Sequence, residues 1–205
     1  MTKIRLLILC ILLLQLELFA QTVEIAPFGG YMVPSRMNGS GGYVRFQDNA
    51  QYGGMVSIGT SPTMDIDLIY TRTDTKAELN YFNYPYQEVP LSINYIHGGF
   101  TNNFRISQTF SPFVGLNAGA CVMSPKEQYD DVWFFSIGVN GGVKIYIGKR
   151  FGFRFQGQLF MPIQGSGFSF VIGSGGSGGG VSLYGTMVQF GVSGGLILRL
   201  GRVTN

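Results

Sequence analysis

Hydrophobic and polar residues alternate along residues 135–159, "FSIGVNGGVKIYIGKRFGFRFQGQL". Odd positions hold nearly all the large apolar side chains, and even positions hold mostly glycine or polar ones. Successive side chains of a strand point to opposite faces, so the pattern predicts two strands joined by a tight hairpin turn at Gly148 to Arg150. The polar face of this hairpin carries Lys144, Arg154, Gln156 and Gln158.

Eight segments of the chain have strand patterns of this kind. They span residues 22–33, 51–60, 63–73, 88–100, 110–123, 131–147, 151–162 and 186–200. Each reaches the length of about 9 to 11 residues that a tilted transmembrane strand needs. The turns at 61–62 and 148–150 are short and the link at 101–109 is of middle length, whereas longer loops are predicted at 34–50, 74–87, 124–130 and 163–185. Short periplasmic turns and longer external loops are typical of outer-membrane barrels, and this pattern puts both chain ends on the periplasmic side.

Composition decides which face of these strands meets water. Only 12% of the 205 residues are charged, against about 25% in ordinary soluble domains. Beyond residue 20 no apolar run is long enough for a membrane helix, so a closed barrel is the remaining way to cross a bilayer. We therefore predict an all-β fold, an eight-stranded antiparallel up-and-down transmembrane β-barrel over residues 21–205, closed between its first and last strands. A net charge of +3 gives no case for a nucleic-acid partner.

The N-terminus has the pattern of a secretory signal peptide. In residues 1–20, Lys3 and Arg5 precede a short apolar run, and Ala20 is the expected cleavage position. Without this segment Cys121 is the only cysteine, so an internal disulfide is excluded. We expect Cys121 to face the barrel interior as an inert, buried thiol.

An apolar face toward lipid implies an enclosed polar face. On this rule the apolar set of each strand faces outward, including Leu91, Ile93 and Tyr95 of the segment 88–100, and alternation places His97 on the same side, near the periplasmic interface. The direction of each strand brings six inward charges into the periplasmic half of the barrel. We predict a lumen ion-pair network that sums to zero charge and plugs the lumen, formed by Glu24, Asp65, Asp67, Lys144, Arg154 and Arg199. The alternative is a hydrated lumen in which water bridges these groups.

The remaining candidate chemistry is weak. His97 is the only histidine, and neither it nor the pair Asp65 and Asp67 is accompanied by the ligands or nucleophile that a metal or catalytic site needs. We predict no catalytic residues, no metal and no cofactor. The glycine-rich segment 164–180 has no lysine followed by serine or threonine after it, so a phosphate-binding loop is not supported. Aromatic residues beside the external loops are predicted to form an interfacial girdle: Tyr81, Tyr84, Tyr86 and Trp133.

Four segments of the chain resemble a known family. They are "APFGGYMVP" (26–34), "FQDNAQYGGMVSIG" (46–59), "LSINYIHGGF" (91–100) and "SPFVGLNAGA" (111–120). Together they look like the small outer-membrane β-barrel domain family common in Bacteroidota, which has the OmpA-like barrel architecture. The resemblance implies this fold and the outer membrane, but it assigns no functional residue. The chain departs from many bacterial barrels in its ending, "LGRVTN", which lacks a terminal aromatic residue.

These patterns lead to one functional expectation and two alternatives. We expect a non-enzymatic outer-membrane protein, a monomer in contact with outer-membrane lipid, with a structural or surface-interaction role. Loops 34–50, 74–87 and 163–185 would form its contact surface for an extracellular or envelope protein partner. The first alternative is a narrow pore or transporter for small solutes. The second is a lipid-modifying enzyme.

Overall fold

A computed structural model describes the chain in eight stretches, which leave out the predicted signal peptide at residues 1–20. The described residues are 22–33, 35–39, 42–81, 84–126, 131–163, 168–172, 179–183 and 187–200. All regular elements among them are β-strands. None of the described residues forms a helix that is long and apolar enough to cross a membrane.

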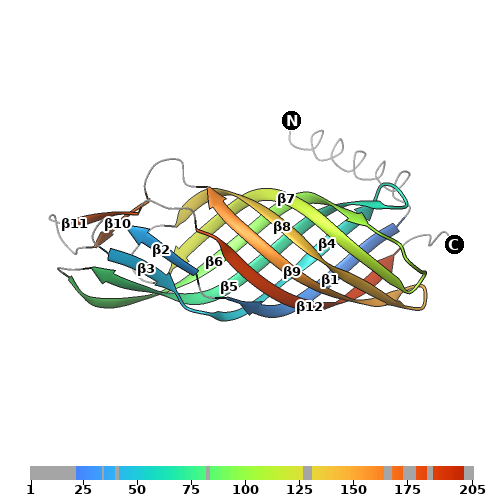
Figure 1. Ribbon diagram of the computed structural model, residues 1–205, viewed down its shortest axis with the longest axis horizontal. Coiled ribbons are helices and arrows are strands. Elements are labelled where there is room, and N and C mark those ends of the chain that lie inside the picture. The colour runs from blue at the N-terminus through green and yellow to red at the C-terminus, as the bar shows by residue number, and fades with distance from the viewer. Residues whose placement is uncertain are drawn as a thin grey trace, which may run out of the picture.

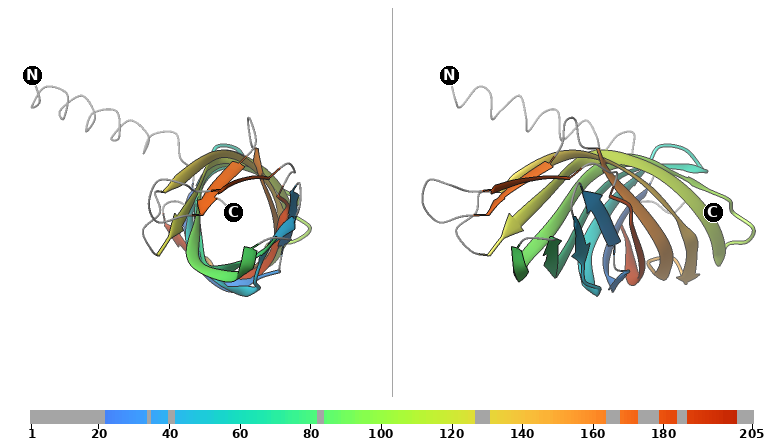
Figure 2. Two further views of the ribbon diagram at one scale, coloured as in Figure 1. Left: turned by 90° about the vertical axis from the view of Figure 1, so that its left-hand side faces the viewer. Right: turned by 60° about the vertical axis from the view of Figure 1, so that its left-hand side comes forward.

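Eight strands close into a barrel, seen from the side in Figure 1 and along its axis in the left view of Figure 2. They are β1 (Thr22–Met32), β4 (Asn49–Gly59), β5 (Met64–Tyr81), β6 (Tyr84–Asn103), β7 (Phe110–Pro125), β8 (Val132–Ile147), β9 (Phe151–Ile163) and β12 (Gln189–Leu200). Each pairs antiparallel with its neighbours in chain order, and β1 pairs with β12 to close the ring. The predicted eight-stranded antiparallel up-and-down barrel is confirmed.

One end of the barrel carries short turns. Residues 60–63, 104–109 and 148–150 connect consecutive strands there. Gly148 has a φ of 74°, a left-handed conformation that glycine adopts without strain, so "GKR" forms the tight hairpin turn that the alternation predicts. The start of β1 and the end of β12 lie at this end too, since Val23 pairs with Leu200.

The opposite end of the barrel extends well beyond the length that a membrane requires. β5 has 18 residues and β6 has 20, whereas a transmembrane strand needs about 9 to 11. Four short strands join them: β2 (Ser35–Gly39), β3 (Gly42–Phe46), β10 (Phe168–Ile172) and β11 (Gly179–Leu183). They follow the order β10-β11-β2-β3-β5 (Figure 1), and we call these strands, with the ends of β5 and β6, the distal sheet.

The loop predicted at residues 74–87 is therefore wrong. β5 continues to Tyr81 and β6 starts at Tyr84, and the two strands pair along this whole stretch. Threonine favours strands, and Thr71, Thr73 and Thr75 share the buried face of this stretch. Parts of the loops predicted at 34–50 and 163–185 are likewise the strands β2, β3, β10 and β11.

The outer surface of the barrel is apolar around its circumference. Exposed large hydrophobic side chains occur on every barrel strand, among them Ile25, Val56, Leu68, Phe100, Leu116, Phe135, Phe155 and Leu196. Polar side chains of the same strands are enclosed, for example Lys144 at 1% and Gln158 at 1% exposure. The inside-out distribution predicted from the hairpin of β8 and β9 is confirmed.

The faces predicted for β6 are reversed, because the residues that were expected to face lipid point into the barrel. Leu91, Ile93, Tyr95 and His97 are buried inside the barrel at 2% exposure or less, while Ile96 and Phe100 of the same strand are exposed to lipid. Tyr95 and His97 pack against Phe160 in the barrel interior. For Leu91 and Ile93 the reason is that the outer half of β6 belongs to the distal sheet, where the outer face meets water instead of lipid. In this part of the strand, as in soluble antiparallel sheets, the apolar side chains pack inward and the polar ones face water.

Candidate functional site: the barrel interior

The turn end of the barrel interior holds a cluster of ion pairs. Lys144 Nζ lies 2.9 Å from Glu24 Oε2 and 2.8 Å from Asp65 Oδ2. Arg199 Nη2 lies 2.8 Å from Glu24 Oε1, which also accepts a hydrogen bond from the Tyr146 hydroxyl at 2.8 Å. The strands alternate in direction, so the starts of β1 and β5 and the ends of β8 and β12 all bring their residues to this level.

Glu24 is the centre of this cluster. Its two carboxylate oxygens accept hydrogen bonds from residues on β8 and β12, and Arg199 is its direct cross-strand partner at the seam where the barrel closes. Lys144 is 1% exposed and the Glu24 side chain 9%. A buried charge is costly unless it is paired, and two carboxylates with two bases leave this cluster neutral.

The other two predicted members of the network lie beside this cluster. The Arg154 guanidinium stacks 3.9 Å above the Phe113 ring, and its Nε donates to Gln156 Oε1 at 2.7 Å. Asp67 accepts a hydrogen bond from Thr101 Oγ1. Within the described part of the chain, neither Arg154 nor Asp67 has an oppositely charged partner within 4.0 Å. The structure thus brings four of the six predicted charges into direct ion pairs, and two into neighbouring polar contacts.

Polar side chains fill the middle of the interior. On β9, Gln156 and Gln158 follow Arg154 and precede Phe160, all on the inner face. His97 Nδ1 lies 2.6 Å from Asn117 Oδ1, which can only accept, so Nδ1 donates this hydrogen bond. Several buried polar atoms of this layer have no hydrogen-bond partner among the described residues: Gln51 Oε1, Thr71 Oγ1, His97 Nε2, Ser136 Oγ, Gln158 Nε2 and Oε1, and Ser193 Oγ.

An apolar cluster fills the interior toward the distal sheet. Tyr95 stacks on Phe160 with ring centroids 4.3 Å apart, and the rings pack among buried side chains of the barrel and of β3. The cluster also contains Met32, Val44, Phe46, Ala77, Val89, Leu91, Ile93, Cys121, Met123 and Met187. Alternation along the sequence does not reveal this cluster, because it predicts the apolar side of β6 to face lipid.

His97 and Cys121 occupy interior positions that bear on the enzyme alternative. The expected outward position of His97 near the periplasmic interface is wrong, since its ring is 1% exposed and contacts Tyr95, Phe160 and Asn117 inside the barrel. Cys121 is a free, buried cysteine, as expected. Among the described residues, no group of three or more His, Cys, Asp or Glu side chains could hold a metal ion.

Known proteins match this arrangement in fold. Neisserial surface protein A (NspA) has 12% sequence identity and a TM-score of 0.57, and the match covers 87% of this chain and 97% of that one. The outer-membrane protein OprG from Pseudomonas aeruginosa has 11% identity and a TM-score of 0.58, over 89% and 97% of the two chains. AlkL, solved by solid-state NMR in DMPC bilayers, has 11% identity and a TM-score of 0.57, over 91% and 94%. No protein family model and no curated protein matches the chain.

The chain has the fold of the small outer-membrane β-barrels. This fold and the apolar belt together place the barrel in the outer membrane. Short turns of such barrels are periplasmic, so we expect the turn end to face the periplasm and the distal sheet to lie outside the cell. At such low identity the likeness carries the fold and assigns no role. The resemblance to the Bacteroidota family stays a prediction.

The predicted interfacial aromatics lie at different heights on the outer-membrane barrel. Trp133, near the start of β8, is 65% exposed at the edge of the apolar belt. Tyr81 and Tyr84 pair with each other at the tip of the hairpin of β5 and β6, beyond the exposed Tyr70. Their backbone is therefore above the membrane interface where they were expected, because the strands continue past the bilayer. Their side chains, and that of Tyr86, lie outside the described part of the structure.

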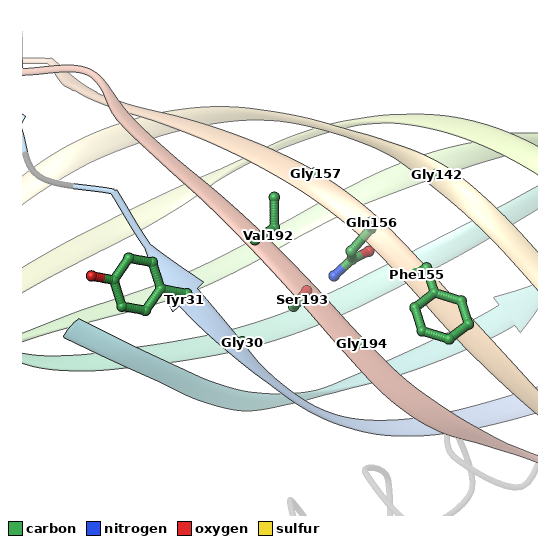
Figure 3. Close-up of a pocket in the computed structure, with 9 residues that line it drawn as sticks. All are labelled: Gly30, Tyr31, Gly142, Phe155, Gln156, Gly157, Val192, Ser193 and Gly194. Atoms are coloured by element: carbon green, nitrogen blue, oxygen red, sulfur yellow. The ribbon is translucent and has the colours of Figure 1, made fainter. Parts of the chain in front are cut away.

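An open depression of about 580 Å³ lies on the lipid-facing surface. Figure 3 shows Tyr31, Phe155 and Val192 beside the glycines of β1, β8, β9 and β12 that form its floor. These three side chains are each more than two-fifths exposed on the outer surface. The depression thus faces the hydrocarbon of the bilayer.

The buried position of Cys121 gives a first prediction. In the folded mature chain, residues 21–205, we expect a maleimide reagent to leave Cys121 unmodified, because its side chain is 0% exposed. Modification should become complete after denaturation, as measured by the mass of the protein. Gln108→Cys, in an exposed turn, serves as the control and should react in the folded state. Rapid modification of Cys121 in the folded barrel would contradict this assignment.

Proposed function

We propose that this chain is a non-conducting, non-enzymatic outer-membrane barrel that displays the distal sheet as a contact surface outside the cell. The observation that carries the proposal is a barrel interior filled by side chains at both ends. The role is structural or one of surface interaction, and the partner is a protein or another component of the cell envelope.

The periplasmic end of the lumen is blocked by the ion-pair cluster. Lys144 reaches from β8 to Glu24 on β1 and to Asp65 on β5, so its side chain bridges separate parts of the barrel wall. Tyr146 and Arg199 pack against each other beside it, with the Arg199 guanidinium 3.8 Å from the Tyr146 ring. A second apolar cluster lies next to this layer: Ala26, Phe28, Met55, Ile69 and Ile197. An eight-stranded barrel is only wide enough for side chains to fill, which supports closure.

The outer half of the lumen is blocked by the apolar cluster around Tyr95 and Phe160. Both side chains are 1% exposed. The Tyr95 hydroxyl donates a hydrogen bond to Gln189 Oε1 on β12, which holds the ring across the barrel from its own strand β6. A buried apolar layer in series with a neutral ion-pair layer opposes the passage of water and ions.

The distal sheet presents charged side chains on its outer face. Lys76 pairs with Glu88 at 2.9 Å between β5 and β6, and Arg72 pairs with Asp74 at 2.9 Å. These pairs are one-third to one-half exposed, so they suit a water-facing surface and contribute little to stability. A polar β-sheet that extends beyond the hydrocarbon core of the bilayer is suited to contact with molecules outside the cell.

Single-channel recordings test the closure of the barrel. We expect the mature chain in planar lipid bilayers to show no steady open-channel current, because both ends of the lumen are filled. Insertion is verified on the same preparation by comparing the gel migration of boiled and unboiled samples, since a folded barrel migrates differently. A steady conductance from the wild-type chain would refute the non-conducting barrel.

The polar middle layer favours a narrow pore as the second candidate function. Its buried, unpaired hydroxyl and amide groups would each cost about 1 to 3 kcal/mol without a partner, and water satisfies such groups. A continuous path of water would still have to pass the layers above and below. In that case a small, cation- or anion-selective current should appear in the recordings, and Gln158→Leu should reduce it.

No feature of the described residues supports the third hypothesis, that of a lipid-modifying enzyme, in the way that the polar middle layer supports a pore. His97, with which that hypothesis begins, points into the barrel and is hydrogen-bonded to Asn117. A lipid substrate reaches the outer surface of the barrel and does not reach this ring. The proposal therefore includes the expectation that the composition of outer-membrane lipid, measured by mass spectrometry, is the same with and without the gene.

A further inference from the structure

Two arginines face each other on the outer face of the distal sheet. Arg36 on β2 and Arg45 on β3 are direct cross-strand partners, and both side chains are exposed. Directly opposite Cβ atoms in a sheet lie about 4.5 to 5.5 Å apart, so the two positive charges are neighbours. A pair of like charges in this position is destabilising, and a bound anion would remove the repulsion.

Neither guanidinium forms an ion pair within the described part of the chain. No carboxylate there lies within 4.0 Å of Arg36 or Arg45, although six other ion pairs are formed. The acid nearest in register is Glu78, the partner of Arg45 on β5. Its Oε1 instead accepts a hydrogen bond from Gln47 Nε2 at 2.6 Å. Both guanidiniums therefore lack an ion-pair partner among the described residues.

The Arg36 side chain is held in place for such a ligand. Its Cζ lies 4.0 Å above the centre of the Tyr43 ring, and the Tyr43 hydroxyl in turn accepts a hydrogen bond from Asn80 Nδ2 at 3.2 Å. Stacking covers a flat face of the guanidinium and leaves the N–H groups around its edge free. These N–H groups form the fork that binds phosphate through two parallel hydrogen bonds.

The height of this pair above the bilayer indicates the source of the anion. Val33 is 40% exposed, and its backbone N–H donates to the carbonyl of Phe190, an exposed residue of the apolar belt. Arg36 follows Val33 closely in the chain, and three residues span at most about 11 Å. The polar headgroup layer adds about 5 to 8 Å to each side of the hydrocarbon core. The long arginine side chains therefore reach the headgroup level of the outer leaflet.

We propose that Arg36 and Arg45 form a binding site for the phosphate groups of an outer-leaflet lipid. The two guanidiniums supply charge-assisted hydrogen bonds to the phosphate oxygens, and the bound headgroup fixes the distal sheet against the membrane surface. The site is exposed, so its affinity falls as the salt concentration rises.

Native mass spectrometry of the mature chain in an uncharged maltoside detergent tests this site. The probes are lipid A with two phosphates and the same lipid after enzymatic removal of the phosphates. We expect dephosphorylation to weaken binding to the wild-type chain at least tenfold. The double variant Arg36→Gln, Arg45→Gln should weaken binding of phosphorylated lipid A to a similar extent. Gel migration of unboiled samples checks that each variant is folded.

The double variant Arg72→Gln, Lys76→Gln is the matched control. It also removes two positive charges from the outer surface of β5, but from side chains that are already paired with Asp74 and Glu88. We expect less than a twofold change in lipid A binding. Equal binding of lipid A to the wild-type chain and the Arg36→Gln, Arg45→Gln variant, or equal binding of the two lipid probes to the wild-type chain, would overturn the site. Full competition by an equal concentration of inorganic phosphate, or arginine-dependent binding of heparin without binding of lipid A, would overturn the lipid as its source.

The proposal of a lipid site and the proposal of a closed barrel can be refuted independently of each other. Loss of lipid binding leaves the current recordings unchanged, because Arg36 and Arg45 lie on the outer face of the distal sheet and not in the lumen. A conducting barrel, conversely, leaves the arginine-dependent binding of lipid A intact.

Discussion

In the Lys144→Met variant we expect the free energy of unfolding to fall by about 3 to 5 kcal/mol. Methionine fills much of the same volume, but it leaves Asp65 without its cation and removes one of the two cations of Glu24. The Lys144 side chain is 1% exposed, so water cannot replace it without opening the cluster. Equilibrium denaturant unfolding in lipid vesicles measures the effect, with the fluorescence of the single tryptophan, Trp133, as the signal.

Two further variants separate charge from packing at this site. Lys76→Met breaks the exposed pair with Glu88, where the side chains are 52% and 37% exposed, and should cost no more than about 1 kcal/mol. Combining Lys144→Met with Asp65→Asn removes the carboxylate that has lost its cation. The double variant should therefore recover part of the lost stability. A Lys144→Met barrel as stable as Lys76→Met would show that the ion-pair cluster does not hold the interior together.

Two adjacent glycines of β4 should respond oppositely to the same added methyl group. A Cβ at Gly53 would point inward, onto the carbonyl oxygen of Tyr70 on the neighbouring strand, and would lie 2.9 Å from Phe28 Cζ. The backbone or the buried ring must then move, and such overpacking costs about 1 to 3 kcal/mol. We expect Gly53→Ala to fall at the upper end of this range, measured by the same unfolding experiment.

Gly54→Ala is the control for this prediction. A Cβ there meets no atom within 4 Å, since it points outward into the lipid. Alanine reduces the backbone freedom of the unfolded chain, so Gly54→Ala should leave the stability unchanged or raise it by about 0.5 to 1 kcal/mol. Similar losses in both variants would mean that the narrow interior does not require glycine at position 53.

The closely packed interior bears directly on the proposed function. Glycines on the inner face make room for large side chains from adjacent strands, as Gly53 does for Phe28 and Gly138 does for Phe160. A barrel built in this way fills its lumen with side chains and leaves the distal sheet as the surface that meets other molecules. If Gly53→Ala and Lys144→Met are both strongly destabilising, the interior acts as a structural core.

The sequence predicted the barrel well where one environment surrounds the whole strand. On β8 and β9 the apolar side chains contact lipid along the full length, so alternation assigned Phe153, Lys144 and Gln158 to the correct faces. On β6 the environment changes from lipid to water partway along the strand. The alternation of Leu91, Ile93 and Tyr95 looks the same in both environments, and the sequence contains no separate signal for the membrane boundary.

By itself, the sequence determined the strand pattern, the even number of barrel strands and the burial of opposite charges near one end, because side-chain period and the scarcity of charge depend only on local residues. The tertiary structure decided which charges meet. Glu24 and Lys144 are far apart in the chain, and their contact depends on the register of each strand pair around the closed ring. It also decided that β5 and β6 extend past the membrane and that Arg36 faces Arg45, because both depend on where each strand pair begins and ends and on its register, which alternation does not specify.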